Sequence, residues 1–405
     1  MNKMSPFGLL ISYEEALAAI DEHVKPTDRT EEVLIGEAVG RVLAEDLVAE
    51  VDVPGFDRAA MDGYAVRADD TFDASPATPR VLKLVEAIQA GETASRSVRK
   101  GECIQISTGC PIPKGADAVV MVEYAERADG DVSVKRPVYP KANIAPRGED
   151  IKKGEIILKK GELLTPARVG VLAALGRRMV RVYAKPRVAI LPTGDEVREP
   201  GAQLEKGQIY DVNSYTLVSI VFINGAVATK FEPVPDTIED LKEAIKRALD
   251  YDLVIFSGGS SVGERDLLYR VAQDLGTVFF HGVQIKPGKP TLFATVGGRP
   301  VFGMPGYPTS CLSNAYLFLV PAIRKMAGLP EKLQRKVKAK LAKRIVSASG
   351  RKQFLTVKLR EGLAYPVFKE SGDITSMAGA DGYLILPANL DVLEEGEEVE
   401  VVLFD

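Results

Sequence analysis

A run of glycine and serine follows the apolar segment Leu253–Phe256. Its backbone N–H groups and hydroxyls can meet around an anion, because glycine permits the close backbone approach that such a cradle needs. A helix is expected to begin after the run, and a helix N-terminus also favours negative charge. Residues 257–266 are therefore predicted to bind a phosphorylated ligand. The residues in question are Ser257, Gly258, Gly259, Ser260, Gly263 and Asp266, the last as a helix cap or as a cation ligand.

Two loops rich in proline and glycine come next along the chain. Residues 286–290 are Lys-Pro-Gly-Lys-Pro, and residues 304–308 are Met-Pro-Gly-Tyr-Pro. The prolines stiffen the first loop, so Lys286 and Lys289 present two ammonium groups on a restricted backbone. Solvated loop charge is the alternative, but two point charges suit a phosphate or a tetrahedral oxyanion. The second loop is predicted to form another rigid turn before a helix.

Acidic turns are scattered over the rest of the sequence. Each alone has an ordinary explanation: an Asp-Gly turn at Asp62, a helix start at Asp195–Glu196 and a helix cap at Asp236. If three or more carboxylates met around a phosphate, each pair near 4 Å would cost about 4 kcal/mol at an effective dielectric constant of 20. A divalent cation would then be needed. Oxygen ligands beside a phosphate favour Mg²⁺ over Zn²⁺.

Composition limits the remaining possibilities. The 405 residues predict two to four domains, and a net charge of -4 offers no basic stripe for nucleic acid. The two histidines and three cysteines have no zinc-ligand or disulfide spacing, which favours a reducing cytoplasm. The apolar patches Phe7–Ile11 and Ala315–Val320 are too short for a secretion leader or a membrane span, so neither export nor membrane insertion is expected.

The elements that must position these residues change in kind along the chain. Ser12 and Glu15 form a capping box for an amphipathic helix. Residues 53–148 contain short strands, with a hairpin turn at Asp129-Gly130, and predict a mainly β module. Thr165 and Pro166 then predict the start of a helix that ends before Gly176.

The second half of the chain has a different pattern. Between residues 186 and 328, apolar strands alternate with helices, as in a parallel-sheet α/β domain. The glycine-serine run lies at the carboxyl end of one such strand, where open α/β sheets bind ligands. Alternating segments such as Phe354–Leu359 predict a small β domain in the tail, and residues 394–402 predict its final strand.

In combination and order, these motifs resemble the molybdopterin molybdenumtransferases, a family that includes the E domain of gephyrin. The resemblance covers nearly the whole chain. It rests on Pro54–Asp57 with Ala60–Ala65, Ser107–Gly109, Arg147–Asp150, Thr193–Glu196 and the segments 257–266, 286–290 and 305–310.

The resemblance implies a multidomain α/β and β fold. Residues 1–52 and 149–185 would form a discontinuous helical and extended linking segment that also serves dimerisation, and residues 53–148 a β-rich inserted module. Residues 186–328 would form a three-layer α/β/α domain with a mainly parallel sheet, and residues 329–405 a C-terminal β domain. A cytoplasmic homodimer is implied. Its implied reaction inserts molybdenum from molybdate into adenylylated molybdopterin, with Mg²⁺ as helper ion and release of AMP.

The resemblance also implies roles for individual residues. The glycine-serine cradle would hold the nucleotide-phosphate end, while Asp236 and Asp266 would bind Mg²⁺ or position water, with support from Glu196. Asp62, Thr108 and Asp150 would approach the cleft from the partner protomer. The oxyanion neighbourhood would comprise Lys286, Lys289, Pro305, Pro308 and Ser310, with Arg351 and Ser376 as weaker candidates.

Four positions depart from the usual family pattern: Arg58, Ala59, Cys110 and Tyr307. They leave open whether molybdate or tungstate is the natural oxyanion.

Two other functions remain as alternatives. A molybdopterin adenylyltransferase shares the α/β domain and its Ser-Gly-Gly loop, but would not need the separate module that carries Asp62 and Asp150. A binding or scaffold protein, as the relation to gephyrin allows, would not need the acidic residues. A hand-over of substrate from a separate adenylyltransferase is a further expectation.

Overall fold

The computed structural model describes residues 10–260, 267–347, 350–367 and 372–404. The chain forms two compact units, each with its own core. The larger unit comprises residues 1–31, 40–42 and 181–405, and the smaller unit comprises residues 32–39 and 43–180. Strands β1 (Thr30–Leu34) and β12 (Met179–Tyr183) carry the chain between them.

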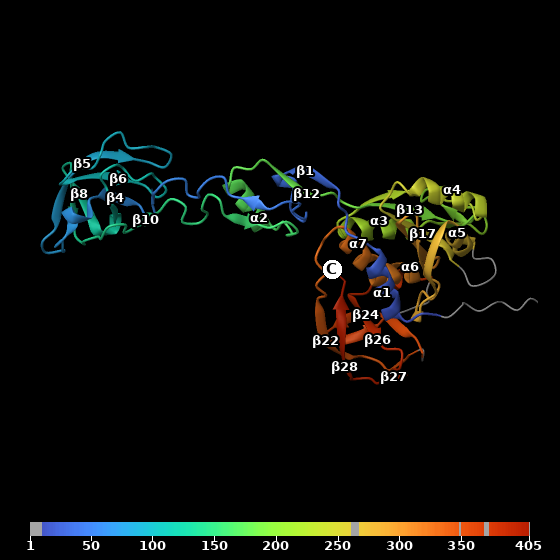
Figure 1. Ribbon diagram of the computed structural model, residues 1–405. Coiled ribbons are helices and arrows are strands. Elements are labelled where there is room, and N and C mark those ends of the chain that lie inside the picture. Colours follow the sequence, from blue (N-terminus) through green and yellow to red (C-terminus); the bar gives the residue numbers. More distant parts are fainter. Residues whose placement is uncertain (1–9, 261–266, 348–349, 368–371, 405) are drawn as a thin grey trace, which may run out of the picture. The chain divides into compact units, whose positions relative to one another are not determined.

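A six-stranded sheet dominates the smaller unit (Figure 1). Its order is β7 (Ala118–Met121), β4 (Gly63–Val66), β6 (Glu102–Ile106), β5 (Arg80–Ile88), β9 (Asp131–Val134) and β8 (Ala125–Ala128). The pair β5–β6 is parallel and the other neighbours are antiparallel. Asp129 and Gly130 join β8 to β9 with φ of 49° and 88°, which confirms the predicted hairpin turn.

Shorter elements complete the smaller unit. Two antiparallel pairs join β2 (Leu47–Val48) to β11 (Ile156–Leu158) and β3 (Arg58–Ala59) to β10 (Ile144–Ala145). Helix α2 (Pro166–Ala174) begins as expected, because the Thr165 side chain accepts a hydrogen bond from Arg168 N, and it stops at Gly176 with φ of 71°. The 3₁₀ turns are η1 (Ile35–Glu37), η2 (Ala68–Thr71) and η3 (Val122–Tyr124).

The larger unit contains the predicted α/β sheet. Its order is β16 (Val227–Lys230), β13 (Arg187–Pro192), β17 (Leu253–Ser260), β21 (Arg299–Pro305), β20 (Leu292–Val296) and β18 (Gly276–His281). The first four strands are parallel, and β20 and β18 extend the sheet in antiparallel fashion. Residues on successive positions of β13 enter different cores: Val188 and Ile190 pack on one face, Ala189 and Leu191 on the other.

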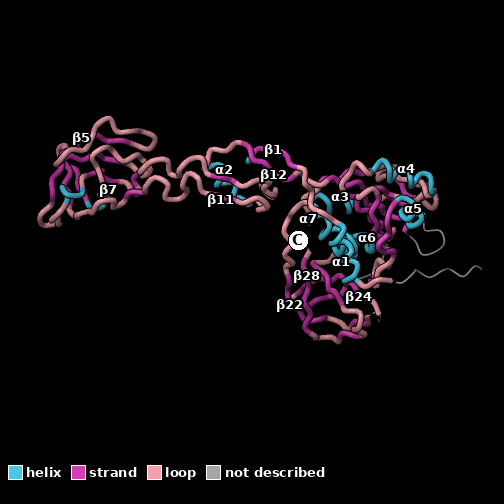
Figure 2. The backbone as a smooth tube through the Cα atoms, in the orientation of Figure 1, coloured by secondary structure: helices cyan, strands magenta, loops and turns pink. Residues whose placement is uncertain are grey.

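Helices cover both faces of this sheet, which confirms the three-layer arrangement. On one face lie α3 (Asn213–Ile223), α6 (Pro308–Asn314), the π-helical turn η4 (Ala315–Leu319) and α7 (Val320–Met326); on the other lie α4 (Ile238–Ala248) and α5 (Leu267–Leu275) (Figure 2). The first layer also includes α1 (Tyr13–His23), whose Ser12–Glu15 capping box is present. Among the described residues, none of the helices has the length and apolar character needed to cross a membrane.

Two local predictions in this domain are wrong. Thr237, not Asp236, caps α4, because its side chain accepts a hydrogen bond from Asp240 N at 3.1 Å. Asp195–Glu196 does not start a helix, since the chain turns there into the short strand β14 (Val197–Arg198), which pairs with β15 (Ile209–Tyr210). Neither Asp236 nor Asp195–Glu196 therefore has the helix-starting role that explained it in the sequence.

The tail forms the predicted C-terminal β domain. Strands β24 (Lys352–Arg360), β25 (Leu363–Pro366), β22 (Lys336–Leu341), β28 (Glu398–Leu403) and β26 (Gly382–Leu386) follow one another, and β26 pairs back to β24, so the five strands close into a ring. A short pair, β23 (Ile345–Val346) with β27 (Val392–Leu393), and helix α8 (Thr375–Ala378) complete it. One strand from the α/β region, β19 (Ile285–Lys286), joins β24 in parallel.

Candidate functional site

A cavity of about 870 Å³ lies at the carboxyl ends of β13, β17 and β21, within the larger unit. The carboxyl ends of these three neighbouring parallel strands meet there, which is the usual ligand-binding edge of an open α/β sheet. Nine of the site residues predicted from sequence line it: Glu196, Asp236, Ser257, Gly258, Lys286, Lys289, Pro305, Pro308 and Ser310. The structure therefore brings together the first two residues of the glycine-serine cradle, the lysine loop and two of the acidic positions.

The cradle wall is built from closely packed backbone. Thr193 N donates a hydrogen bond to Ser257 O at 3.0 Å, which ties the loop after β13 to the end of β17. Gly258 has φ of 97°, and a Cβ at this position would lie 2.8 Å from Thr193 O. Only glycine fits this close approach. Gly259 and Ser260 form the end of β17, whereas Gly263 and Asp266 lie outside the described residues.

Asn314, the last residue of α6, holds the lysine loop from within the α/β domain. Its Nδ2 donates to Gly288 O at 2.8 Å and to Thr291 Oγ1 at 2.6 Å, and Thr291 Oγ1 donates to Gly288 O at 2.9 Å. Gly288 has φ of 90°, and a Cβ there would lie 2.4 Å from Asn314 Nδ2. The loop between Lys286 and Lys289 is therefore packed directly on a buried polar side chain.

The C-terminal β domain holds the same loop from the other side. In the β19–β24 pair, Lys286 lies opposite Gln353, and Lys352 N donates to Gln284 O at 3.0 Å. The C-terminal domain thus contributes to the position of a pocket lysine through backbone pairing. Its two weaker candidates do not line the cavity. Arg351 immediately precedes β24, and the buried Ser376 of α8 donates its hydroxyl to the carbonyl oxygen of Asp373, just before the helix, at 2.8 Å.

On the acidic side of the cavity, the pKa of Asp236 is raised above its ordinary value. Partial burial is the main cause, and the negative charges of Asp195 and Glu196 raise the pKa further. Among the residues that the structure describes, no group of three His, Cys, Asp or Glu side chains is arranged to hold a metal ion. One or two carboxylates together with phosphate oxygens are, however, the usual ligands of Mg²⁺ in phosphoryl-transfer sites. The donors present fit a cation that needs the phosphorylated ligand to complete its coordination.

The raised pKa of Asp236 predicts that Asp236→Asn stabilises the ligand-free protein. The native state holds the Asp236 proton more tightly than the unfolded state does, so stability falls as pH rises from about 4 through the raised native pKa. Asp236→Asn has no carboxyl group to ionise, so its stability does not fall in this way. Without divalent cations at pH 7, its Tm should exceed that of the wild type by about 1–2 °C. Thermal unfolding by circular dichroism between pH 3.5 and 8 measures this, and a lower Tm in the variant at pH 7 would contradict it.

The smaller unit carries the three remaining predicted residues. Asp62 Oδ1 accepts hydrogen bonds from Thr108 N at 2.6 Å and Thr108 Oγ1 at 2.9 Å, and these bonds lower the pKa of Asp62. The Thr108 hydroxyl therefore ties its turn to the Asp62 turn in this structure. Asp150 is exposed, and its backbone N donates to Val53 O at 3.0 Å.

Several polar residues of the cavity were not predicted from the sequence. Asp211 lies in it with a buried side chain, and its Oδ1 accepts a hydrogen bond from Ser214 N at 2.9 Å while Lys230 lies 3.6 Å from its Oδ2. Asn213 Nδ2 donates to Gly306 O at 2.8 Å, which ties α3 to the turn after β21. The sequence offered one signal, the Asp-x-x-Ser spacing of Asp211 and Ser214 before an apolar helix. This spacing is typical of a helix cap, and it does not indicate which strands lie beside the helix.

Comparison with known proteins gives a consistent result along the chain. Sequence models match for the MoeA N-terminal region (domain I and II) at residues 11–176, for a probable molybdopterin binding domain at residues 189–325, and for the MoeA C-terminal region (domain IV) at residues 338–404. These three matches follow one another in the order of the N-terminal module, the α/β domain with the cavity, and the C-terminal β domain.

Individual relatives match over nearly the full length. A molybdopterin biosynthesis protein of Methanocaldococcus jannaschii is 38% identical over 395 residues, which are 95% of this chain and 94% of that protein. A molybdopterin molybdenumtransferase of Staphylococcus aureus is 32% identical over 378 residues, 92% of this chain and 90% of that protein. The crystal structure of a molybdopterin biosynthesis MoeA protein from Pyrococcus horikoshii has a TM-score of 0.85 at 42% identity, and the match covers 98% of this chain and 100% of that one. On this sequence identity, coverage and fold, the chain belongs to the molybdopterin molybdenumtransferase family.

Proposed function

We propose that this protein inserts molybdenum from molybdate, or tungsten from tungstate, into adenylylated molybdopterin and releases AMP. One observation carries the proposal: the end of β17, the Lys286–Lys289 loop and Asp236 line a single cavity of about 870 Å³. Hydroxyl and backbone donors with two cations suit a phosphoanhydride, and the adjoining carboxylates suit a cation beside it. Family membership supports the same substrate class.

In this reaction, one water cleaves the phosphoanhydride, so that AMP and the phosphate of molybdopterin separate. Two Mo–S bonds form, one oxo ligand of molybdate leaves as water with the two thiol protons, and no electron is transferred. Ser257 and the backbone at Gly258 would bind phosphate oxygens. Lys286 and Lys289 would neutralise the negative charge of the anhydride and of the incoming oxyanion, while Asp236 and Glu196 would orient the attacking water.

Mg²⁺ is part of the proposal. Asp236, with Glu196 nearby and Asp266 from outside the described residues, would hold it together with phosphate oxygens. When bound, the ion would polarise the bridging phosphoryl oxygens. Its presence would also remove the repulsion that raises the pKa of Asp236.

We further propose that the protein acts as a cytoplasmic homodimer, in which Asp62, Thr108 and Asp150 of the partner complete the cleft. Exposed apolar side chains on α3 support a protein contact there, because Phe222 and Ile223 are 73% and 58% exposed. Hand-over of substrate from a separate adenylyltransferase is part of the same proposal. Sedimentation of the full chain at the mass of one copy would contradict the dimer.

The direct test uses purified protein with Mg²⁺, molybdate and adenylylated molybdopterin. We expect AMP release above a protein-free blank, metal-loaded product, and at least a tenfold lower rate after chelation of Mg²⁺, because phosphoryl transfer depends on charge neutralisation. A parallel reaction with tungstate compares the two oxyanions. A third reaction, with ATP and free molybdopterin, tests the adenylyltransferase alternative. AMP no higher than the blank would refute the proposal.

A further inference from the structure

An aromatic residue stands at the mouth of the cavity. Tyr307 lies between Gly306 and Pro308 at the N-cap position of α6 and is 66% exposed although it lines the cavity. Tyr210 and Ile209 of β15 are 42% and 55% exposed and line the same cavity. Large apolar side chains in such a position are open to a ligand rather than to the protein core.

Three segments of the larger unit lie close to Tyr307 or to its neighbour Gly306. Asn213 Nδ2 donates to Gly306 O at 2.8 Å. Gly306 lies close to the cradle, since a Cβ at Gly306 would be 3.8 Å from the Cα of Gly258. On the side of the C-terminal β domain, a Cβ at Gly372 would be 3.8 Å from Cδ1 of Tyr307. One edge of the ring therefore lies near Gly372 while most of the side chain stays exposed, as a stacking platform requires.

Three buried polar atoms of cavity-lining residues have no hydrogen-bond partner among the described residues: Thr193 Oγ1, Asn213 Oδ1 and Asp211 Oδ2. The three residues are 3%, 7% and 5% exposed, and in the part of the chain that the structure describes only Asp211 Oδ2 has a cation, Lys230 Nζ, at 3.6 Å. Because Asn213 Nδ2 must face the Gly306 carbonyl, the orientation of its amide is set and Oδ1 remains as an acceptor. A buried acceptor without a partner costs about 1–3 kcal/mol, and a phosphate or an oxyanion has no hydrogen to offer it. A ring N–H or an amino group does.

From these observations we infer that Tyr307 and Asn213 recognise a flat heteroaromatic ring at the mouth of the cavity. Tyr307 stacks on the face of the ring, and Asn213 Oδ1 accepts a hydrogen bond from a ring N–H or exocyclic amino group. This inference rests on the proposed function for the ligand, which contains two such rings, a purine and a pterin. The lysine loop serves the phosphates of the same molecule.

Direct binding separates the two rings without any turnover. Isothermal titration calorimetry of the full chain uses AMP for the purine, 6-hydroxymethylpterin for the pterin, and ribose 5-phosphate as a probe with a phosphate but no aromatic ring. We expect Tyr307→Ala to weaken one of the two ring-bearing probes about tenfold, because stacking on an aromatic side chain contributes about 1–3 kcal/mol per base. Tyr307→Phe should retain the affinity, Asn213→Leu should weaken the same probe, and ribose 5-phosphate should be unaffected by Tyr307→Ala.

Tyr139→Ala is the matched control, because Tyr139 is 70% exposed but belongs to the smaller unit. Melting curves show whether each variant is folded. If Asn213→Leu unfolds, the comparison of Tyr307→Phe with Tyr307→Ala still decides the test. Equal affinities of wild type and Tyr307→Ala for both ring-bearing probes would overturn the inference, as would equal loss for ribose 5-phosphate. Failure of the proposed function is a different result: no AMP release by the wild type in the turnover assay, whatever the binding data show.

Discussion

Lys286→Met is expected to lower kcat/KM for AMP release by about 100-fold. Removing one preorganised charge donor from a site where negative charge must be held costs about 10²–10³ in rate in comparable enzymes. Methionine keeps the length of the unbranched side chain but lacks the ammonium group. Since Lys286 is exposed and its backbone is paired with Gln353 of β24, the fold should persist and Tm should stay within about 2 °C.

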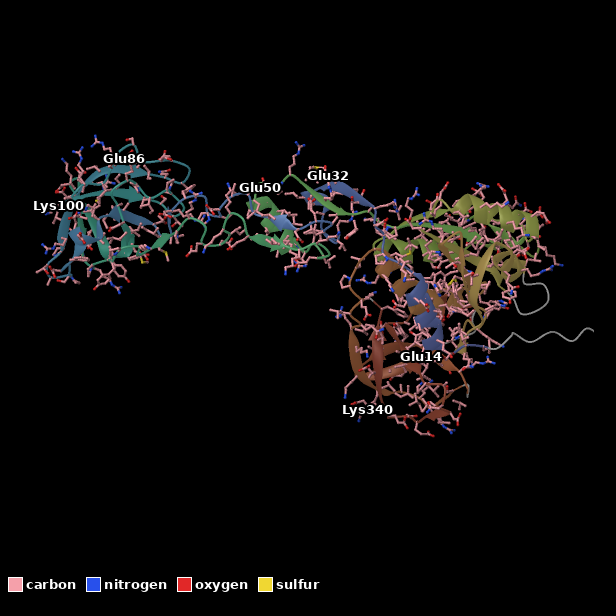
Figure 3. The ribbon with its side chains drawn as sticks, viewed as in Figure 1. Glu14, Glu32, Glu50, Glu86, Lys100 and Lys340 are labelled. Atoms are coloured by element: carbon pink, nitrogen blue, oxygen red, sulfur yellow. The ribbon has the colours of Figure 1, made fainter. Side chains whose placement is uncertain are left out.

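Lys340→Met provides the matched control for this prediction. Lys340 is an exposed lysine of the same unit, on β22 of the C-terminal β domain, away from the cavity lining (Figure 3). Steady-state AMP release over a range of substrate concentrations, at fixed Mg²⁺ and molybdate, measures both variants. If Lys286→Met and Lys340→Met changed kcat/KM equally, the role of the lysine loop in substrate binding would be wrong.

Gly288→Ala is expected to destabilise the larger unit by about 3 kcal/mol or more. A left-handed backbone costs a non-glycine residue about 1–2 kcal/mol. The added methyl group would also displace Asn314, whose Nδ2 lies 2.4 Å from the position of that Cβ, and the loss of its buried hydrogen bonds costs about 1–3 kcal/mol more. The corresponding fall in Tm is about 6–12 °C. AMP release should fall with it at temperatures where the variant is folded, because the lysine loop must move.

Gly298→Ala is the control that separates the cost of a left-handed backbone from the cost of the steric clash with Asn314. Gly298 also has a left-handed backbone, with φ of 77°, but nothing lies within 4 Å of a Cβ built there. Its free energy of unfolding should therefore fall only by the cost of the left-handed backbone, about 1–2 kcal/mol. Urea unfolding of both variants gives the two free energies of unfolding. Equal losses would show that the Asn314 contact does not restrain the loop.

Local patterns in the sequence were sufficient for the individual elements. The capping box at Ser12, the Thr165-Pro166 helix start and the Asp129-Gly130 hairpin are all present, because each depends on residues within one turn of chain. The alternation of strands and helices likewise predicted the α/β domain and the edge of its sheet where the cavity lies. The error at Asp236 has the same origin: two neighbouring residues, Asp236 and Thr237, both suit an N-cap, and local spacing does not choose between them.

The residue types of the site followed from the sequence, whereas their arrangement depended on the tertiary structure. Glycine, serine and lysine in proline-stiffened loops predicted a phosphate-binding chemistry, because that chemistry belongs to the side chains and backbone themselves. Only the fold places Lys286 beside β24, Asn314 beneath Gly288, and Asn213 against Gly306. Each of these contacts joins segments far apart in the chain, and their pairing depends on sheet order and core packing, which no local spacing records.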